Sequence, residues 1–397
     1  MKVLVVNAGS SSIKYQVFDM KDESVLAKGL VDRVGIPGTT LKHEPTGKDD
    51  VLIKKDLPDH TAGMKLVLEV LVNDEYGCIK SMDEIGAVGH RVVHGGEDFA
   101  VSVVIDDKVK KVIRDCFDVA PLHNPPNLMG IEACEELMPN VPHVAVFDTA
   151  FHQTMTPANF MYALPYDVYE KFKVRRYGFH GTSHFYVAHR AADMLGKAYE
   201  DCKIITLHLG NGASMAAIKN GKVIDTSMGF TPLEGLVMGT RSGDVDPAIV
   251  FFLMEKLNMD ASEANNYFNK KSGLLGLSGV SNDLRDIQEA AEAGNERAIL
   301  ALDVYYNKVK GYIGNYIAKL NGCDCLVFTA GVGENGIEMR ENICKDLEAL
   351  GIKMDAAKNK VRGKEVDVAA DDSKVRIFII PTNEELVIAR DTLGLSK

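Results

Sequence analysis

A strand–loop–strand pattern occurs twice in this chain. The first copy, VLVVNAGSSSIKYQVFD, covers residues 3–19, and the second, IITLHLGNGASMAAI, covers residues 204–218. In both copies a β-branched run stops at a polar, glycine-containing turn, Asn7-Ala8-Gly9-Ser10 in one and His208-Leu209-Gly210-Asn211 in the other. Backbone N–H groups and small polar side chains that converge on such a turn suit phosphate oxygens. The duplication therefore predicts two similar half-proteins that hold a polyphosphate between them, and phosphoryl transfer as the chemistry.

The similarity of the two halves extends beyond the hairpins. Each half begins with a predicted three-stranded meander, over residues 2–7, 13–19 and 24–32 and over residues 203–209, 213–219 and 222–228. Each meander leads into alternating helices and strands, and Asn220-Gly221 is a strong hairpin turn. This order is typical of an α/β fold with duplicated actin-like (ribonuclease H-like) ATPase domains, each with a mixed five-stranded sheet.

Further elements follow from hydrophobic periodicity. Helices are predicted over residues 63–73, 302–320 and 337–350, and a last helix is expected to start around residues 381–385 and to return to the first domain. The remaining predicted strands are 85–93, 144–147, 325–329 and 376–380. A chain of 397 residues is too long for one core, and we place an N-terminal domain at 1–150 plus 384–397 and a C-terminal domain at 151–383.

Composition excludes several classes of partner. A net charge of −11 argues against nucleic acid and against an anionic membrane surface. No apolar run approaches the roughly 20 residues that span a bilayer. Seven scattered cysteines do not form a disulfide framework, and the Cys323-x-Cys325 pair has no second pair to complete a metal site. We therefore expect reduced thiols and a cytoplasmic location.

A glycine-rich segment at Gly331-x-Gly333-x-x-Gly336 follows one predicted strand and precedes a helix. The spacing matches a Rossmann dinucleotide turn, with Asp355 near the position of a ribose-binding acid. Too little chain remains after it for a dinucleotide domain, so a backbone turn near a nucleotide, or a plain helix cap, is the better interpretation. The chain contains no G-x-x-x-x-G-K-[ST] motif and is not a P-loop enzyme.

Charged side chains at the ends of predicted strands are candidates for chemistry. Arg91 and Arg241 lie in glycine-containing polar runs, where a guanidinium can bind a carboxylate or a phosphoryl group with two donors. Asp148 and Glu384 follow buried strands, where open α/β sheets place their ligands, and each is expected to pair with Mg²⁺ or an arginine. For Glu384, a plain acid at a helix N-terminus is the alternative.

The roles of the histidines in two motifs are not decided by the sequence. The His180-Gly181-Thr182-Ser183-His184 spacing suggests a metal pair, but the glutamate of zinc-protease helices is absent. A histidine that donates a hydrogen bond to a phosphoryl oxygen fits His180 better, with a structural loop histidine as the alternative. His123 lies in the proline-rich PLHNPPN loop, where functional and structural interpretations are equally supported.

Taken together, the motifs resemble those of the acetokinase (acetate kinase) family. The matching runs, spread from residue 1 to the final helix, are NAGSSSIKYQVFD, GHRVVHGG, PLHNPPN, VFDTAFHQTM, RRYGFHGTSH, HLGNGAS, GTRSGDVDP, FTAGVGEN and PTNEE. The resemblance implies the actin, Hsp70 and sugar-kinase superfamily, a homodimer, and reversible transfer of a phosphoryl group between ATP and acetate, with Mg²⁺ (or Mn²⁺) as cofactor and acetyl phosphate and ADP as products.

The resemblance also implies roles for individual residues. Asn7 and Glu384 would hold the metal ion, and Asp148, His180, Arg91 and Arg241 would be catalytic. The acyl substrate would contact Arg91, Val93, Leu122, His123, Phe179 and Pro232. The nucleotide and its phosphates would contact Ser10, Ser12, Lys14, His208, Gly210, Asn211, Asp283, Leu284, Arg285, Gly331, Gly333 and Asn335.

Elementary chemistry refines this picture. Acetate, with a pKa of about 4 to 5 like that of glutamate, is already ionised at neutral pH, so a general base has little to remove. We therefore interpret Asp148 as orienting Arg91 or the metal shell. The arginines, His180 and Mg²⁺ would offset repulsion between two anions in a direct in-line transfer. Propionate or butyrate kinase is the alternative within the family, and an actin-like or chaperone-like nucleotide-gated binding protein is the alternative outside it.

Overall fold

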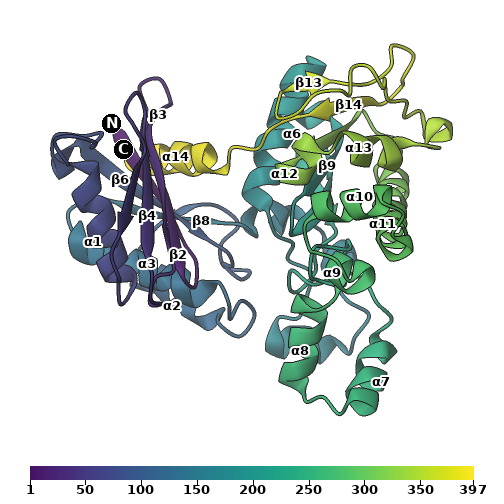
Figure 1. The fold of residues 1–397 in the computed structure, drawn as a ribbon, viewed down its shortest axis with the longest axis horizontal. Coiled ribbons are helices and arrows are strands. Elements are labelled where there is room, and N and C mark those ends of the chain that lie inside the picture. Colours follow the sequence, from purple (N-terminus) through teal and green to yellow (C-terminus); the bar gives the residue numbers. More distant parts are fainter. The chain divides into compact units, whose positions relative to one another are not determined.

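The computed structural model describes all 397 residues and divides the chain into two compact units (Figure 1). Unit 1 comprises Met1–Gln153 and Asn383–Lys397, and unit 2 comprises Thr154–Thr382. Each unit contains one mixed β-sheet with helices packed against it. None of the helices combines the length and the apolarity that crossing a bilayer requires.

The sheet of unit 1 has eight strands in the order β5-β4-β3-β2-β1-β6-β8-β7. Strands β1 to β5 are joined as an antiparallel meander, while β1, β6 and β8 run parallel to one another. The strands are β1 (Lys2–Ala8), β2 (Ser12–Asp19), β3 (Ser24–Asp32), β4 (Thr40–Pro45), β5 (Val51–Lys54), β6 (Ile85–Val92), β7 (Val103–Val104) and β8 (His143–Phe147).

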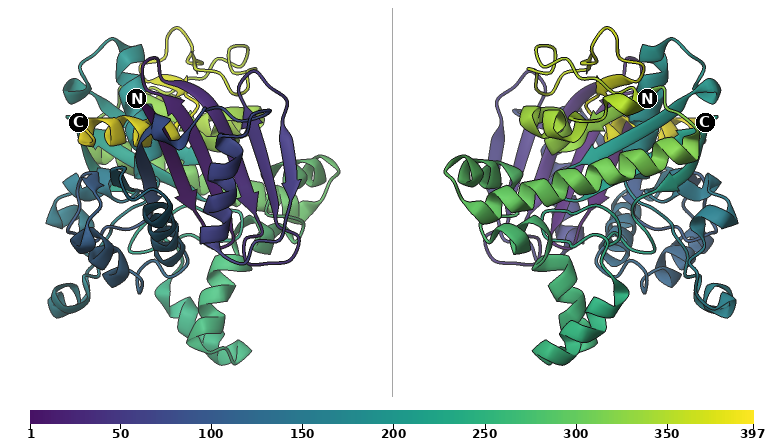
Figure 2. Two further views of the ribbon diagram at one scale, coloured as in Figure 1. Left: turned by 90° about the vertical axis from the view of Figure 1, so that its left-hand side faces the viewer. Right: turned by 90° about the vertical axis from the view of Figure 1, so that its right-hand side faces the viewer.

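Helices cover this sheet because its strands bury apolar side chains. Leu4, Ile13 and Val88 lie in a core cluster with side chains of α1, and α3 packs on α1, β1 and β6. The last helix, α14, packs against β1, β6 and β8 (Figure 2). A Cβ on Gly89 would lie 2.3 Å from Thr392 Oγ1, so this close approach of α14 to β6 needs a glycine. The helices of unit 1 are α1 (His60–Leu71), α2 (Asp107–Asp115), α3 (Asn124–Leu137) and α14 (Glu384–Leu395).

The sheet of unit 2 has six strands in the order β11-β10-β9-β12-β14-β13. The strands are β9 (Lys203–Leu209), β10 (Ala213–Lys219), β11 (Lys222–Thr226), β12 (Cys325–Thr329), β13 (Val366–Asp367) and β14 (Arg376–Ile379). Helix α6 packs on β9 and β12, and the long α11 crosses β9 and β10 (Figure 2). The helices are α4 (Pro157–Phe160), α5 (Tyr166–Phe172), α6 (Gly181–Leu195), α7 (Pro247–Leu257), α8 (Ala261–Lys270), α9 (Gly273–Ser278), α10 (Leu284–Glu292), α11 (Glu296–Leu320), α12 (Ala330–Asn335) and α13 (Ile337–Cys344).

The two sheets share a five-stranded core with one topology. In unit 1 the core is β3-β2-β1-β6-β8, and in unit 2 it is β11-β10-β9-β12-β14; the first three strands are antiparallel, and the last two run parallel to the central one. The duplicated α/β fold is therefore confirmed. The prediction of five strands per sheet is wrong as a total, because β4, β5 and β7 extend the first sheet and β13 extends the second.

Two local predictions are also corrected. The segment from Gly331 to Asn335, expected as a turn, lies in the short helix α12. The helix predicted to continue to residue 350 ends at Cys344, because Lys345 takes an extended conformation and Asp346 has a positive φ of 60°. Helix α12 packs on β9 and β12, so tertiary contact rather than the propensity of its glycines accounts for this helix.

A pair of histidines is buried in unit 1. His90 Nε2 lies 3.0 Å from His143 Nδ1, and His143 Nε2 lies 3.2 Å from the Met138 carbonyl, to which it donates. This pattern allows at most one of the two rings to be cationic, because only one hydrogen lies between His90 Nε2 and His143 Nδ1. Burial and the neighbouring His143 lower the pKa of His90. Burial also lowers the pKa of His143, against the effect of Glu135 and together with that of Lys110.

Candidate active site

Parallel pairing of β6 and β8 brings Arg91 and Asp148 together in unit 1. Val92 is in register with Phe147, and the Asp148 N–H donates to the Val92 carbonyl at 2.9 Å. Arg91 donates to Asp148 through Nη2, and through Nε at 3.3 Å to the second carboxylate oxygen. The Asp148 side chain is only 2% exposed. This bidentate pair fixes the plane of the guanidinium.

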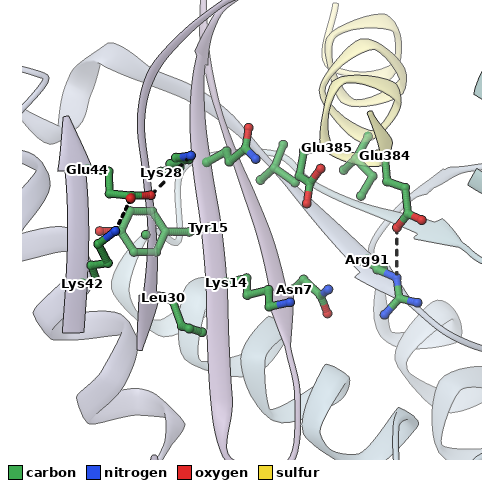
Figure 3. A pocket seen from close by; sticks show the side chains of 14 residues that line it. Asn7, Lys14, Tyr15, Lys28, Leu30, Lys42, Glu44, Arg91, Glu384 and Glu385 are labelled. Carbon is green, nitrogen blue, oxygen red and sulfur yellow. Dashed lines mark hydrogen bonds and ion pairs between the residues drawn. The ribbon is translucent and has the colours of Figure 1, made fainter. Parts of the chain in front are cut away.

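Glu384 is the second carboxylate near Arg91. It is the first residue of α14, and its Oε2 lies 4.0 Å from Arg91 Nε (Figure 3). Burial raises the pKa of Glu384 to about 7; the Arg91 charge opposes this shift, and the Asp148 charge adds to it. One guanidinium thus faces two carboxylates, and an additional cation would stabilise their ionised forms.

Asn7 and Lys14 lie on adjacent strands near these groups. They are cross-strand partners on β1 and β2, and together with Arg91 and Glu384 they line a cavity of about 190 Å³ (Figure 3). The cavity also extends along the open face of the sheet to Lys28, Lys42 and Glu44. Lys42 is paired with Glu44, and Lys28 Nζ lies 3.4 Å from the same carboxylate.

The oxygen ligands present fit a magnesium ion. The Asn7 amide and the Glu384 carboxylate line one cavity, and both offer the hard oxygen donors that Mg²⁺ binds. The structure contains no cluster of three or more His, Cys, Asp or Glu side chains suited to a metal ion. Mg²⁺ does not need such a cluster, because it usually takes one or two protein ligands together with water and substrate phosphates. Because the structure contains no such cluster, it gives no support to a zinc site at the His180 motif.

The remaining predicted residues of unit 1 do not line this cavity. Ser10 is exposed in the β1–β2 turn, which is closed by the Gly9 N–H donating to the Ser12 carbonyl at 2.7 Å. Val93 is buried directly after β6, His123 is the residue before α3, and Leu122 is 60% exposed. Their shared acyl pocket with Phe179 and Pro232 of unit 2 stays a prediction.

In unit 2, His180 has an unusual backbone. It precedes α6 with φ of 56° and ψ of 27°, a left-handed conformation that is uncommon for a residue with a side chain. Its ring stacks on that of His208, with the centroids 4.1 Å apart. Such a conformation often marks a functional position, because the surrounding structure must impose it.

Gly212 lies against both His180 and Arg241. A Cβ on Gly212 would be 3.4 Å from Arg241 Nη1 and 3.7 Å from His180 Nε2, so both donors approach the β9–β10 turn closely. Burial lowers the pKa of Arg241, and the only bond of its guanidinium given by the structure is to Met238 Sδ at 3.8 Å. No carboxylate of the described chain forms an ion pair with it. Arg241 is thus a half-buried cation that lacks an anion.

A second cavity of about 580 Å³ lies in unit 2. It brings together seven of the predicted nucleotide-binding residues, Gly210, Asn211, Asp283, Leu284, Arg285, Gly331 and Asn335. Gly333 and His208 do not line it. Asp283 caps α10 and holds Arg285 through an ion pair, and the exposed Arg285 side chain stands at the cavity. The volume suits a nucleoside rather than a small acid.

Sequence reasoning missed part of each lining. In unit 2 the residues that no prediction named are Gly239, Leu274, Asn282, Gln288, Tyr305 and Arg362, whereas Val332 and Gly336 belong to the glycine-rich segment expected near a nucleotide. Gly239 and Asn282 could have been found, because they belong to the GTRSGDVDP and SNDLR runs that carry Arg241 and Asp283. Arg362 lies far from any motif, and only the fold places it at this cavity.

Relatives of known identity match the whole chain. The model of the acetokinase family covers residues 2–390. An acetate kinase from Syntrophomonas wolfei is 86% identical over 397 residues, which is 100% of both chains. Among solved structures, Porphyromonas gingivalis acetate kinase has a TM-score of 0.96 with 52% identity and full coverage of both chains. A propionate kinase from Francisella tularensis has a TM-score of 0.93 with 39% identity over 99% of each chain.

The duplicated sheets, with glycine-containing turns at equivalent strand ends, give the chain the duplicated actin-like α/β fold that it shares with the solved acetate kinase. Among proteins of this fold, the chain belongs to the acetokinase family. It is therefore a kinase, and the nucleotide-gated binding protein considered from the sequence is not supported.

Proposed function

We propose that this protein catalyses the reversible, Mg²⁺-dependent transfer of a phosphoryl group from ATP to acetate, giving acetyl phosphate and ADP. The observation that carries the proposal is the small cavity of unit 1, in which Arg91, Lys14 and the two oxygen ligands Asn7 and Glu384 meet. A carboxylate-binding cation thus lies beside a phosphate turn and a site for a divalent ion. Unit 1 is assigned the acyl substrate and the metal, and unit 2 the nucleotide.

Arg91 binds the carboxylate of the acyl substrate in this proposal. Its guanidinium is held by Asp148 through two hydrogen bonds, so its orientation is set before the substrate arrives. Asp148 acts as a positioning residue, because acetate has no proton to give up at neutral pH. A fixed guanidinium places the acetate oxygen for an in-line attack on the γ-phosphorus.

The second group of donors stabilises the transferring phosphoryl group. Arg241 and His180 approach the same glycine, Gly212, and Arg241 has no anionic partner in unit 2. As negative charge spreads over the phosphoryl oxygens, a guanidinium and an imidazole N–H at this position stabilise it. The acetate–phosphorus bond forms as the bond to the ADP oxygen breaks, and no covalent enzyme intermediate is needed.

Mg²⁺, held by Asn7 and Glu384, would neutralise charge on the nucleotide phosphates when bound. The raised pKa of Glu384, about 7, fits this role, since a carboxylate whose ionised form is poorly compensated gains most from a cation. Ser10, Ser12 and Lys14 of unit 1 and His208, Gly210 and Asn211 of unit 2 are assigned to the phosphate chain of the nucleotide.

Trapping of the acyl phosphate with hydroxylamine tests the reaction class. The purified protein with ATP and Mg²⁺ is expected to form acyl hydroxamate from acetate. Propionate and butyrate are compared in parallel, because a pocket discriminates one methylene by only about 1–3 kcal/mol and a propionate kinase of known structure shares the fold. Absence of hydroxamate with all three acids would refute the proposed function.

A homodimer is also proposed, on the basis of an apolar surface in unit 2. Helix α7 carries exposed Ile249, Phe251, Phe252 and Leu257, of which Phe251 is 72% exposed. Together with α8 it projects from the remainder of unit 2 (Figure 1). A second copy of the chain would cover this surface. Sedimentation of Phe251→Asp against the unmodified protein tests this, and a monomer in both cases would contradict it.

A cytoplasmic location is proposed from the cysteines. All seven are free thiols in the structure. Five of them are buried, and burial raises the pKa of Cys116 to about 12, which keeps that thiol protonated and unreactive. Free, buried thiols are typical of proteins in a reducing compartment.

A further inference from the structure

A chain of hydrogen bonds runs beneath His180 inside unit 2. Ser214 Oγ lies 2.8 Å from His180 Nδ1 and 2.8 Å from His184 Nε2. His184 Nδ1 in turn lies 2.6 Å from Thr206 Oγ1. Ser214, His184 and Thr206 are all fully buried, on β10, α6 and β9 respectively. The sequence motifs that contain these residues gave Ser214 and Thr206 no role and His184 only that of a possible metal ligand, and none of the three lines the cavities described above.

The single hydrogen of Ser214 couples the two imidazoles. A hydroxyl donates one hydrogen bond and accepts others, so Ser214 donates to only one of the two ring nitrogens. The other nitrogen must carry its own hydrogen and donate to Ser214. The tautomers of His180 and His184 are therefore linked, and fixing one ring fixes the other.

Thr206 sets the direction of the chain. Its hydroxyl has two acceptors within reach, His184 Nδ1 at 2.6 Å and the Ala216 carbonyl at 3.5 Å. The second distance is too long for a strong hydrogen bond, so the hydroxyl hydrogen is directed to His184 Nδ1. His184 then carries its hydrogen on Nε2 and donates to Ser214, and Ser214 donates to His180 Nδ1.

The direction of this chain determines whether His180 Nε2 carries a hydrogen. Because Nδ1 accepts a hydrogen bond, a neutral His180 carries its hydrogen on Nε2. This is the nitrogen beside Gly212, near Arg241 Nη1. We propose that Thr206, His184 and Ser214 are positioning residues that hold His180 as the Nε2–H tautomer, so that the neutral imidazole donates a hydrogen bond to the transferring phosphoryl group. No proton leaves His180 in this role.

The inference rests on the proposed phosphoryl transfer only for its catalytic consequence. The tautomer itself is measured by ¹⁵N NMR of protein labelled at histidine, with the His180 signals assigned by their loss in His180→Ala. Hydrogen on Nε2 is expected in the unmodified protein, and a mixture of tautomers in Ser214→Ala. Hydrogen on Nδ1 of the unmodified protein would overturn the proposal, whatever reaction the protein catalyses.

Kinetics test whether Ser214 acts through His180. Ser214→Ala should lower kcat about tenfold, the effect of one lost hydrogen bond, and leave the KM values for ATP and acetate unchanged. In the His180→Ala background the same substitution should cost nothing more. An equal loss in both backgrounds would overturn the role of the chain. Failure of the unmodified protein to make acyl phosphate would instead refute the function and leave the NMR result standing.

Thr206→Val provides a second variant that keeps the shape of the side chain. It removes the donor that sets the direction of the chain, and it should lower kcat, with recovery in Thr206→Ser. Thr226→Val is the matched control, because Thr226 is also buried, on β11 of the same sheet, but its hydroxyl donates to the Met215 carbonyl at 2.9 Å instead of to a histidine. Equal effects of the two valine substitutions on kcat would contradict the proposal.

Discussion

The role of Asp148 can be decided by replacing it with asparagine. Asp148→Asn keeps the size of the side chain but removes the charge that holds Arg91. The amide oxygen can still accept one hydrogen bond, whereas its NH₂ group faces a guanidinium that also only donates. Glu384, 4.0 Å from Arg91 Nε, is then the remaining carboxylate beside the arginine. Arg91 is expected to turn toward Glu384 and to lose its orientation for the acyl substrate.

The size of the effect follows from the bonds that are lost. Asp148 accepts two charge-assisted hydrogen bonds from Arg91, and its side chain is only 2% exposed, so solvent screens them little. One hydrogen bond to a charged group contributes about 1.5–3 kcal/mol. At about 1.4 kcal/mol per factor of ten, the loss of one such bond lowers kcat/KM for acetate about 10- to 150-fold. Most of this loss should appear in the KM for acetate.

The hydroxamate assay, run over a range of acetate concentrations, separates this role from general base catalysis. A base contributes about 10²- to 10⁴-fold to kcat and leaves substrate binding intact. Asp225→Asn is the matched control, since Asp225 is also buried and paired with cations, Lys319 and Arg176, outside the site. An unchanged KM for acetate with kcat reduced more than a thousandfold would refute the positioning role of Asp148.

Four further outcomes are expected. Arg241→Ala should abolish most activity without lowering the free energy of unfolding, because burial of this unpaired cation is unfavourable in the free protein; a large loss of stability in urea unfolding would contradict this. Gly239→Ala should raise the KM for ATP, since its Cβ would lie 1.8 Å from Asn211 Oδ1, with the acetate KM as the internal comparison. Chelation of Mg²⁺ should stop the reaction, and readdition should restore it; activity that survives exhaustive chelation would exclude the metal role. As the pH falls below about 6.5, the free energy of unfolding should decrease by up to about 1.4 kcal/mol per pH unit for each of His90 and His143. The reason is that the pKa values of both histidines are lowered in the folded state, so the unfolded chain takes up the protons. Urea unfolding at several pH values measures this slope, and His143→Asn should reduce it.

Much of the fold could be predicted because the strands that form its core repeat a clear pattern. The β1–β3 and β9–β11 meanders consist of short apolar or alternating strands, and the turns β1–β2, β9–β10 and β10–β11 contain glycine. Strands β4 and β5, the outermost strands at one edge of the first sheet, are short, each contains one lysine, and β4 ends at Pro45. Such edge strands carry little hydrophobic signal, because one side of each strand lies in solvent. The sequence therefore indicated the repeated core and not its extensions.

The helix α12 was missed for a related reason. Its sequence, AGVGEN, has two glycines in six residues and favours a turn by propensity. The structure makes it helical directly after β12, where Gly333 packs close to the backbone of Phe328. Tertiary contact thus overrides local preference at this position.

Candidate site residues could be predicted where they lie at the ends of predicted strands. Arg91 lies near the end of β6 and Asp148 directly follows its parallel neighbour β8, so their meeting needed only the strand assignment. The histidine chain could not be predicted in this way, because Thr206, His184 and Ser214 come from two strands and a helix and meet only through the register of β9 with β10 and the packing of α6. Buried polar contacts of this kind depend on distances of a few tenths of an ångström, which no residue pattern encodes.

The buried charges of each unit differ in what would stabilise them. In unit 1 a single guanidinium, Arg91, lies beside two carboxylates, and burial together with the Asp148 charge raises the pKa of Glu384 despite Arg91. In unit 2 Arg241 has no carboxylate partner, and burial lowers the pKa of its guanidinium. A buried ionised group gains most from an opposite charge that the protein itself does not supply, so the unit 1 cluster is suited to a cation and the surroundings of Arg241 are suited to an anion.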